Sequence, residues 1–229
     1  MELELEIGAS PGSISRIENG KVNPTKETII NIARALKLDT YDIASLFGVD
    51  LKDLTSIFKI TTKLILSNDL KFILNNVVNE LIFRLGYLAS ALFLVENNIV
   101  KVAAFTNSNI GEKVLACLEE PLDKFELSLE KDLNNLTVKS INENRVYVTY
   151  FTREYRMPAF SRKVADKIQE VSGDQSNIIY PLATGKKPFG AIVYVKKIKD
   201  DFSSEKKVLQ LVTKQISISI QKALIYKKA

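Results

Sequence analysis

Residues 8–31 read GASPGSISRIENGKVNPTKETIIN, and two glycines divide this stretch into short helical segments. Gly8 interrupts a first helical pattern. Ser10 and Pro11 then start a second helix, because Ser is a good N-cap and Pro fits the first helical position. Gly20 is placed to end that helix. The stretch therefore predicts a helix, a sharp turn and a second short helix. Over residues 1–47 as a whole, the pattern predicts short helices at roughly 2–7, 10–18, 26–36 and 40–47.

The second of these helices has an apolar side and a polar side. Ile14 and Ile17 recur at helical spacing, so we expect them to face a core. The other side carries small or polar residues that could reach base edges and phosphates: Gly12, Ser13, Ser15, Arg16 and Asn19. A short helix with such an exposed face, set behind a sharp turn, is how a helix-turn-helix enters the major groove of DNA.

The same residues resemble the phage repressor/Cro-type (XRE) helix-turn-helix family. The resemblance is carried by GAS at 8–10, ISRIENGK at 14–21, NPT at 23–25 and ETIINIARAL at 27–36, and it covers about the first fifth of the chain. It implies double-stranded DNA as a partner. The residues at the family's base-contacting positions are Pro11, Gly12, Ser13, Ser15 and Arg16, and those at its phosphate-contacting positions are Asn19 and Lys21.

The chain departs from this family in two ways. The family has a full helix before the motif, whereas only residues 2–7 precede Gly8, so the resemblance is to a helix-turn-helix whose first helix is missing. Glu4 also stands where the family usually has a small Ala between the two motif helices. Residues 1–50 hold five Lys or Arg against eight Asp or Glu, a net charge of about −3. Because phosphate contacts supply most nonspecific DNA affinity, such a module is expected to bind weakly alone, or to be vestigial.

Composition sets limits on the rest of the chain. The 229 residues, 46% of them hydrophobic, suffice for one large domain or two small ones. No apolar run approaches the length of a membrane span, and one cysteine excludes an internal disulfide framework, which together favour the cytoplasm. Cys117 lies in an apolar stretch and is expected to be buried. The chain has no histidine, and no catalytic or metal-binding constellation stands out, so we expect no enzyme activity, no metal and no cofactor.

The pattern after residue 50 predicts a mixed domain. Two amphipathic helices are expected over 50–67 and 69–85, and the first could pair with a copy of itself. Strands are then expected over 90–95, 99–105, 123–129, 146–149, 177–183 and 188–196, with Glu96-Asn97-Asn98 as a hairpin turn. Further helices are expected over 111–118, 133–143, 159–171 and 203–222.

This order of elements resembles the GAF family, the small-molecule-sensing relatives of PAS domains. The resemblance is carried by SALFLV at 90–95, NENRVYV at 142–148, IIYPL at 178–182 and FGAIVY at 189–194, and it covers about residues 53–222. It implies an α+β chain: a helix-turn-helix module over 1–47, a connecting amphipathic helix over 48–68 and a GAF-like sensory or dimerisation domain over 69–229. An antiparallel sheet with helices on one face can leave a ligand cavity on the other.

A small-molecule effector is possible, and its identity is not indicated by the sequence. Aromatic residues that could line a cavity, or simply pack in the core, are Phe93, Phe105, Tyr147, Phe151, Tyr155 and Tyr180. Residues 152–158 are irregular and charged where such domains have a pocket lid. Arg153 or Arg156 there could bind an anion, or the segment could be an ordinary solvated loop. The several cysteines of GAF-type methionine sulfoxide reductases and the Cys-His pair of bilin-binding relatives are absent.

The sequence thus predicts a homodimeric, cytoplasmic transcription regulator with a repressor-type helix-turn-helix and a GAF-like domain that senses a ligand or dimerises the chain. The helices over 53–67 and 203–222 would form the dimer interface. The alternative is a non-catalytic dimerisation or scaffold protein with a vestigial helix-turn-helix.

Overall fold

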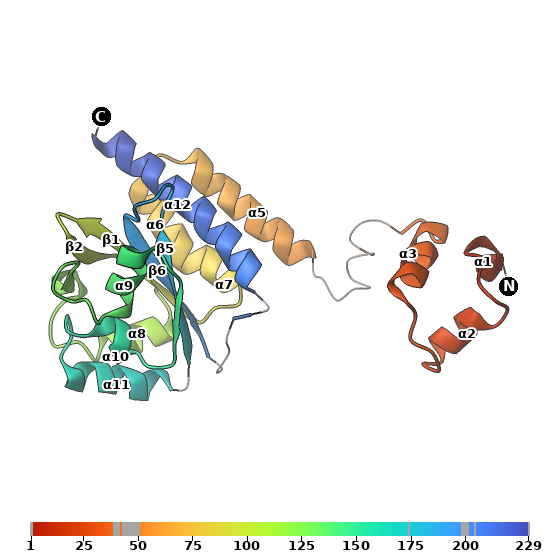
Figure 1. Cartoon of the computed structure of the whole chain (residues 1–229), viewed down its shortest axis with the longest axis horizontal. Helices are drawn as coiled ribbons and strands as arrows, with labels where there is room; N and C mark the ends of the chain where they lie inside the picture. The colour runs from red at the N-terminus through yellow and green to blue at the C-terminus, as the bar shows by residue number, and fades with distance from the viewer. Residues whose placement is uncertain are drawn as a thin grey trace. The chain divides into compact units, whose positions relative to one another are not determined.

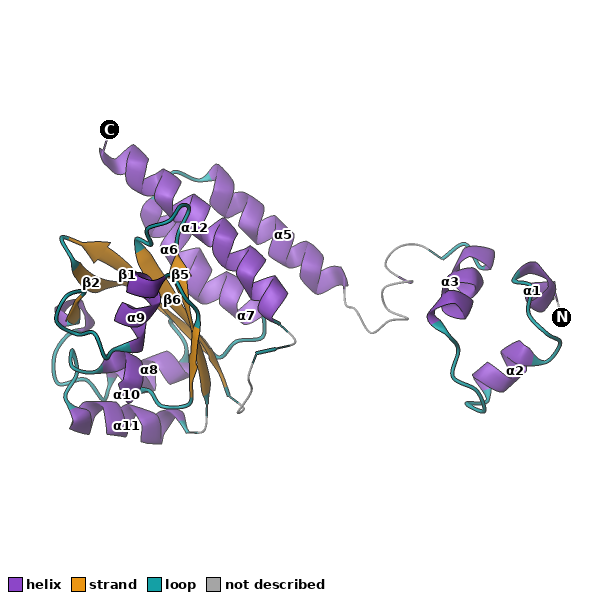
Figure 2. Ribbon diagram, viewed as in Figure 1, coloured by secondary structure: helices purple, strands orange, loops and turns teal. Residues whose placement is uncertain are grey.

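The structure, a computed structural model, describes residues 2–38, 42, 51–173, 175–197, 202–203 and 205–228. It divides into two units, Met1–Ser56 and Ile57–Ala229, which are drawn in Figures 1 and 2. The helix expected over 40–47 lies, except for residue 42, outside the described residues. The boundaries expected at 47 and 68 stay predictions.

The first unit consists of short helices. They are α1 (Glu2–Glu6), α2 (Ser13–Glu18) and α3 (Lys26–Ala35). Thr25 caps α3, because its side chain accepts a hydrogen bond from the backbone N–H of Thr28 at 3.2 Å. The extents of α1 and α3 agree with the sequence prediction to within one residue.

The start of α2 differs from the prediction. Ser10 is not its cap and Pro11 is not its first residue, because residues 10–13 form a turn in which the Ser13 N–H donates to the Ser10 carbonyl at 3.0 Å. Gly12, at φ 76° and ψ 3°, has the conformation of the third residue of a type II turn. Proline followed by glycine is the usual centre of such a turn, and this preference prevails over the capping signal.

The end of α2 agrees with the prediction. Gly20 has φ 66°, in the left-handed region that glycine adopts at little cost. The N–H of Lys21 donates to the carbonyl of Arg16 at 2.8 Å, and the N–H of Gly20 donates to that of Ile17 at 2.9 Å. These two bonds make the Schellman arrangement, which satisfies the last carbonyls of the helix.

Glu4, the unusual residue of this segment, links α1 to α2. Its side chain is 6% exposed, and its Oε1 accepts a hydrogen bond from the backbone N–H of Ile14 at 3.1 Å. Ile14 lies in the first turn of α2, where backbone N–H groups have no partner within the helix. A buried carboxylate thus does the work that an N-cap side chain would do, since Gly12 has none.

The second unit is built on one antiparallel sheet of six strands in the order β3-β2-β1-β6-β5-β4. The strands are β1 (Ala89–Glu96), β2 (Ile99–Phe105), β3 (Glu126–Ser128), β4 (Tyr147–Thr149), β5 (Ser176–Leu182) and β6 (Gly190–Lys196). The hairpin between β1 and β2 turns at Asn97 and Asn98, both with positive φ, as the sequence predicted. Helices cover both faces of the sheet, so the chain is α+β, as expected (Figure 2).

One face is covered by the first and last helices of this unit (Figure 1). These are α5 (Leu51–Leu66), α6 (Leu70–Asn76), a π-helical turn η1 (Val77–Leu81), α7 (Ile82–Arg84) and α12 (Lys206–Lys228). The helix expected over 69–85 is therefore interrupted by a π turn, while Asp69 caps its start by accepting from the Phe72 N–H. Lys222 of α12 donates to the carbonyl of Ile65 near the end of α5 at 2.8 Å, which fixes these two helices together.

The opposite face carries shorter helices. They are α8 (Asn109–Leu115), a 3-10 turn η2 (Leu122–Lys124), α9 (Leu136–Glu143), α10 (Arg153–Arg156) and α11 (Arg162–Ser172). Residues 152–158, expected to be irregular, therefore contain one helical turn, α10. A second apolar core, centred on Phe93, Phe125 and Ile179, fills most of the space between these helices and the sheet.

Candidate DNA-binding helix and ligand cavity

Helix α2 presents an exposed polar side. Of the residues at the resembled family's DNA-contacting positions, those with exposed side chains are Pro11, Ser15, Arg16, Asn19 and Lys21. Gly12 is half-buried, and the Nη1 of Arg16 lies 3.7 Å from the position that a Cβ on Gly12 would take. The Asn19 side-chain amide donates a hydrogen bond to the carbonyl of Ser15 at 2.6 Å, so one of its donors is already used within the helix. Assignment of these residues as DNA contacts stays a prediction.

Ser13 differs from its neighbours in this set. Its Oγ is buried and has no hydrogen-bond partner among the described residues. A hydroxyl in that position cannot reach a base without a rotation of the side chain. Ile14 and Ile17, expected to face a core, are half-buried rather than fully buried. The side chains of α2 that could reach DNA without such a rotation are those of Arg16 and the exposed residues beside it, and the role of all these residues stays a prediction.

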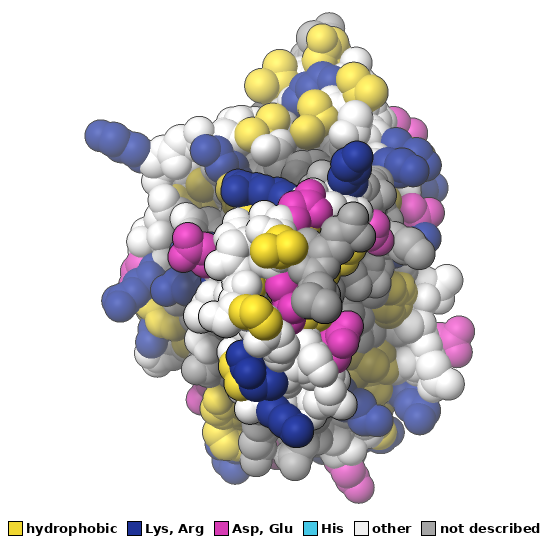
Figure 3. Space-filling model, turned by 90° about the vertical axis from the view of Figure 1, so that its right-hand side faces the viewer, with side chains coloured by type: hydrophobic (Ala, Val, Ile, Leu, Met, Phe, Trp, Pro, Cys, Tyr) yellow, Lys and Arg dark blue, Asp and Glu magenta, His cyan; other side chains and the backbone are white. Residues whose placement is uncertain are grey.

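Charge gives DNA binding only mild support. Among the described residues on the face drawn in Figure 3, Lys and Arg side chains are interspersed with Asp and Glu and do not form one basic patch. The first 50 residues are acidic overall. Because affinity for DNA depends strongly on neutralised phosphates, this module is expected to bind measurably only at low salt or when two copies act together.

The second unit has a small cavity between the sheet and the helices α8, α10 and α11. Its volume is about 20 Å³. The residues that form its apolar floor are Ala89, Ala91, Val193 and Val195, and the half-buried residues at its edge are Phe105, Ile110 and Ser172. A larger surface hollow of about 790 Å³ lies between α6, β2 and the end of α12. Within the described residues, no buried unpaired polar atom lines that hollow.

Arg156 is the charged residue that lines the small cavity. Its side chain is 8% exposed, and its guanidinium lies 5.2 Å from the centre of the Tyr155 ring. Its Nη2 donates to the Tyr155 hydroxyl at 3.3 Å. That hydroxyl donates in turn to the Oδ1 of Asn177 at 3.1 Å, and Gln175 donates to the same oxygen at 3.2 Å. The Nε of Arg156 is buried and unpaired among the described residues.

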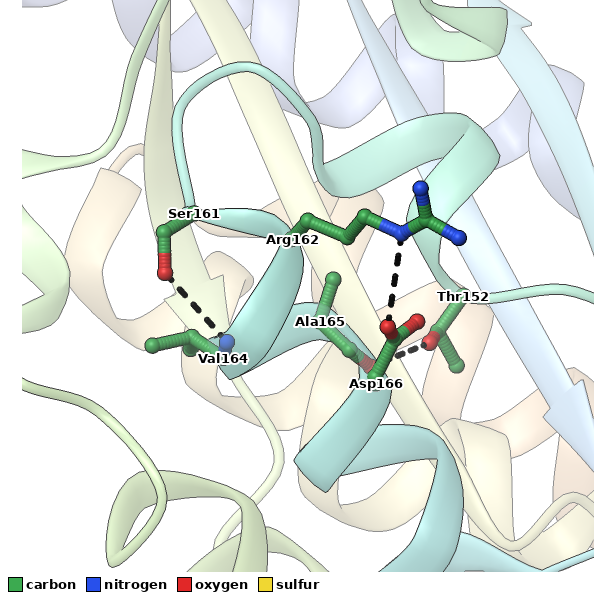
Figure 4. Close-up of polar contacts among 6 residues, drawn as sticks. All are labelled: Thr152, Ser161, Arg162, Val164, Ala165 and Asp166. Carbon is green, nitrogen blue, oxygen red and sulfur yellow. Dashed lines mark hydrogen bonds and ion pairs between the residues drawn. The ribbon is translucent and has the colours of Figure 1, made fainter.

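The segment that carries Arg156 is held by hydrogen bonds to α11 (Figure 4). The Thr152 hydroxyl donates to the carbonyl of Ala165 at 3.1 Å, and the Thr152 N–H donates to the side-chain oxygen of Gln169 at 2.9 Å. Ser161 begins α11 by accepting from the Val164 N–H at 3.3 Å. Because Thr152 immediately precedes α10, these bonds fix the direction in which α10 enters the domain.

The structure brings together only some of the aromatic residues proposed for a pocket. Phe105 and Tyr155 line the small cavity, and Phe93 packs in the same apolar core. Tyr147 lies at the border of that core, and Phe151 is 49% exposed. Tyr180 packs in the core on the other face of the sheet, so it cannot line this cavity. Neighbouring residues of a strand point to opposite faces, which separates Tyr180 from the residues that line this cavity. Assignment of the aromatic residues to a ligand pocket stays a prediction.

Gln175 and Asn177 were missed by the sequence analysis. Both are buried; Gln175 immediately precedes β5 and Asn177 is its second residue. The polar run Gln175-Ser176-Asn177 directly before the apolar residues of a strand was a usable signal, since polar groups buried in a core are hydrogen-bonded to one another.

Cys117 is buried, and its thiol donates to the carbonyl of Lys113 at 3.2 Å. Within the described ranges, no group of three or more Cys, Asp or Glu residues could hold a metal ion. Of the helices in the described part of the chain, none has the length and hydropathy to cross a bilayer.

Comparison with known proteins gives separate matches for the N-terminal part of the chain and for the second unit. Residues 2–43 match the helix-turn-helix family model HTH_3. No curated protein sequence matches the chain significantly. Many solved structures resemble the second unit. The GAF domain of a phosphoenolpyruvate-protein phosphotransferase from Acinetobacter has a TM-score of 0.54 at 16% identity, over 75% of this chain and 94% of that one.

Two further structures are similar to this chain. The GAF domain of the corresponding protein from Coxiella burnetii has a TM-score of 0.54 at 15% identity, over 78% of this chain and 98% of its own. A free methionine-R-sulfoxide reductase from Neisseria meningitidis has a TM-score of 0.52 at 12% identity, over 75% of this chain and 89% of its own. The chain therefore has an N-terminal helix-turn-helix of the XRE type followed by a domain with the GAF fold.

Proposed function

We propose that the protein is a cytoplasmic transcription regulator that binds double-stranded DNA through α2 and senses a small molecule through its GAF-fold domain. The observation that carries the proposal is the exposed polar side of α2, with Arg16, in a segment that matches a helix-turn-helix family. The regulatory character of both domain types supports a non-catalytic role.

The test compares two substitutions in the same helix. Arg16→Ala removes an exposed guanidinium, and the loss of one base contact costs about 1–3 kcal/mol, which is roughly a fivefold to 150-fold loss of affinity. Ser13→Ala removes a hydroxyl that is buried, so it serves as the matched control and should leave both DNA affinity and melting temperature nearly unchanged. Footprinting on genomic DNA fragments at low salt measures both variants.

The alternative function is a scaffold or dimerisation protein with a vestigial helix-turn-helix. The acidic balance of residues 1–50 favours it. If the wild-type chain protects no DNA fragment even at low salt, the scaffold proposal replaces the regulator. If wild type binds and Arg16→Ala binds equally well, α2 is not the reading helix.

Both functions require a homodimer, which we also propose. Helix α12 exposes a stripe of large apolar side chains, with Leu211 65% and Ile225 62% exposed and Ile218 between them. Residues 211, 218 and 225 are seven apart, the spacing with which a helix pairs with a copy of itself. A dimer would also present two reading helices to two half-sites.

Sedimentation tests the dimer. The wild-type chain at micromolar concentration is expected to have twice the chain mass of 25.7 kDa, and Leu211→Glu is expected to be monomeric. Leu133→Glu is the matched control, because Leu133 is 55% exposed but lies far from α12 in sequence, before α9. A wild-type monomer, or a dimer that survives Leu211→Glu, would exclude this stripe as the interface.

A further inference from the structure

Arg156 places a positive charge in the interior of the GAF-fold domain. Its guanidinium is more than nine-tenths buried, and no carboxylate among the described residues pairs with it. Within the described part of the chain, its side chain contacts the hydroxyl and the ring of Tyr155, which are uncharged. A buried charge without a counter-ion costs several kcal/mol, so native proteins pair such charges or use them to hold a ligand.

The hydrogen-bond network around Arg156 does not supply the missing acceptor. The Tyr155 hydroxyl accepts one hydrogen bond from Arg156 and donates its own O–H to the Oδ1 of Asn177. The Oδ1 of Asn177 is shared with Gln175, and the Nδ2 of Asn177 donates to the carbonyl of Thr149 at 3.2 Å. The network is therefore directed away from Arg156 and leaves the Nε–H of the guanidinium free beside the cavity.

From this geometry we propose that the cavity binds a small carboxylate, with acetate as its simplest form, and that Arg156 holds the carboxylate group. A guanidinium presents parallel N–H donors that match the two oxygens of a carboxylate. Part of the remaining wall is apolar, formed by Ala89, Ala91, Val193 and Val195, and this part suits a methyl group. Uncharged polar residues also line the cavity: Ser90, Tyr155, Ser172 and Gln175. This inference rests on the proposed sensory role of the domain and names the class of its effector.

The size of the cavity restricts the ligand. A volume of about 20 Å³ holds little more than one water-sized group, so even acetate requires side chains at the edge of the cavity to move. A large ligand such as a nucleotide or a tetrapyrrole does not fit without rebuilding this part of the core. Phe105, Ile110 and Ser172 are only half-buried at the edge of the cavity, so small shifts there open a path for a short chain.

The experiment uses the full chain and measures melting temperature and heat of binding at constant ionic strength. Acetate is expected to raise the melting temperature with saturation. Acetamide, which has the same shape and no charge, is expected not to raise it, and chloride at equal ionic strength is the reference. An equal response to acetamide or to chloride would overturn the carboxylate assignment.

Matched variants locate the site. Arg156→Met keeps the length and apolar stem of the side chain, and it is expected to weaken acetate binding about tenfold to a hundredfold, as for a lost charged hydrogen bond. Arg156→Lys keeps the charge without the fork and is expected to bind weakly. Arg153→Met is the control, because Arg153 is exposed on the same helical turn, with its guanidinium 5.1 Å from the Phe151 ring. It should titrate like wild type, and a wild-type titration by Arg156→Met overturns the proposal.

One internal alternative is tested in the same series. Asp174 lies outside the described residues, and Asp174→Asn removes an acidic group close in sequence to Gln175. If acetate binds only in Asp174→Asn, the chain itself supplies the counter-ion and the proposal fails. These measurements contain no DNA. Loss of acetate binding therefore leaves the DNA-binding proposal standing, and failure of the footprinting leaves the carboxylate site standing.

Discussion

Substitution of Glu4 is expected to weaken the contact between α1 and α2. Its carboxylate accepts from the partly buried N–H of Ile14 at 3.1 Å. A hydrogen bond to a charged group contributes about 1.5–3 kcal/mol, and a neutral one about 0.5–1.5 kcal/mol. Glu4→Gln keeps an acceptor of the same size and should cost about 1 kcal/mol. Glu4→Ala leaves the Ile14 N–H without its partner and should cost about 1–3 kcal/mol.

The effect should be local, because little else is buried in this unit. Of its described side chains, only those of Glu4 and Ala33 are buried. Amide hydrogen exchange across α2 is the suitable assay, since a loss of about 1.4 kcal/mol in local stability speeds exchange about tenfold. Glu6→Gln is the control, because Glu6 lies in the same helix with an exposed carboxylate. If Glu4→Ala exchanges like Glu6→Gln, the Glu4 bond does not stabilise α2.

Two further predictions concern the second unit. Burial and the bond to Glu205 raise the pKa of Tyr87 far above its ordinary value, and burial does the same for Tyr194. The folded state therefore keeps these protons when the unfolded chain loses them, so stability is complete below about pH 10 and falls above it, by at most about 1.4 kcal/mol per pH unit for each tyrosine. Urea unfolding across alkaline pH should show this fall, and Tyr87→Phe should reduce its slope; an unchanged slope would refute the assignment. A chain that begins at Asp50 should also melt cooperatively, because this unit has its own cores, whereas aggregation would place the boundary elsewhere.

The sequence predicted those parts of the fold that depend on local patterns. The alternation in 90–95 and 99–105 and the pair Asn97-Asn98 predict a hairpin, because asparagine tolerates positive φ in a two-residue turn. The prediction of where α2 starts was wrong because two local signals compete there. Ser10 and Pro11 are typical of a helix start, and Pro11 and Gly12 are typical of a type II turn. The turn leaves the Ile14 N–H without a capping side chain, and the Glu4 carboxylate that accepts its hydrogen bond lies ten positions away in the sequence.

The sequence did not show on which face of the sheet each buried residue lies. In a sheet that is exposed on one side, the polar residues identify the outer face. Here both faces are buried, so Tyr180 and Ile179 belong to different cores although both read as interior residues. The aromatic character of Tyr180 and Tyr155 therefore predicted that both are buried. It could not predict that they belong to the cores on opposite faces of the sheet.

The case of Arg156 shows why a charged segment is the hardest feature to assign. Arg153 and Arg156 lie three residues apart in the same helical turn, and from the sequence either one could be solvated or buried. Thr152 decides the outcome, because its bonds to Ala165 and Gln169 fix how α10 is set against α11. With α10 fixed, Arg153 is exposed beside Phe151 and Arg156 enters the core. A helix partner more than ten residues away thus determines which arginine can meet a ligand, and replacement of Thr152 by Val should weaken acetate binding without removing any group from the cavity wall.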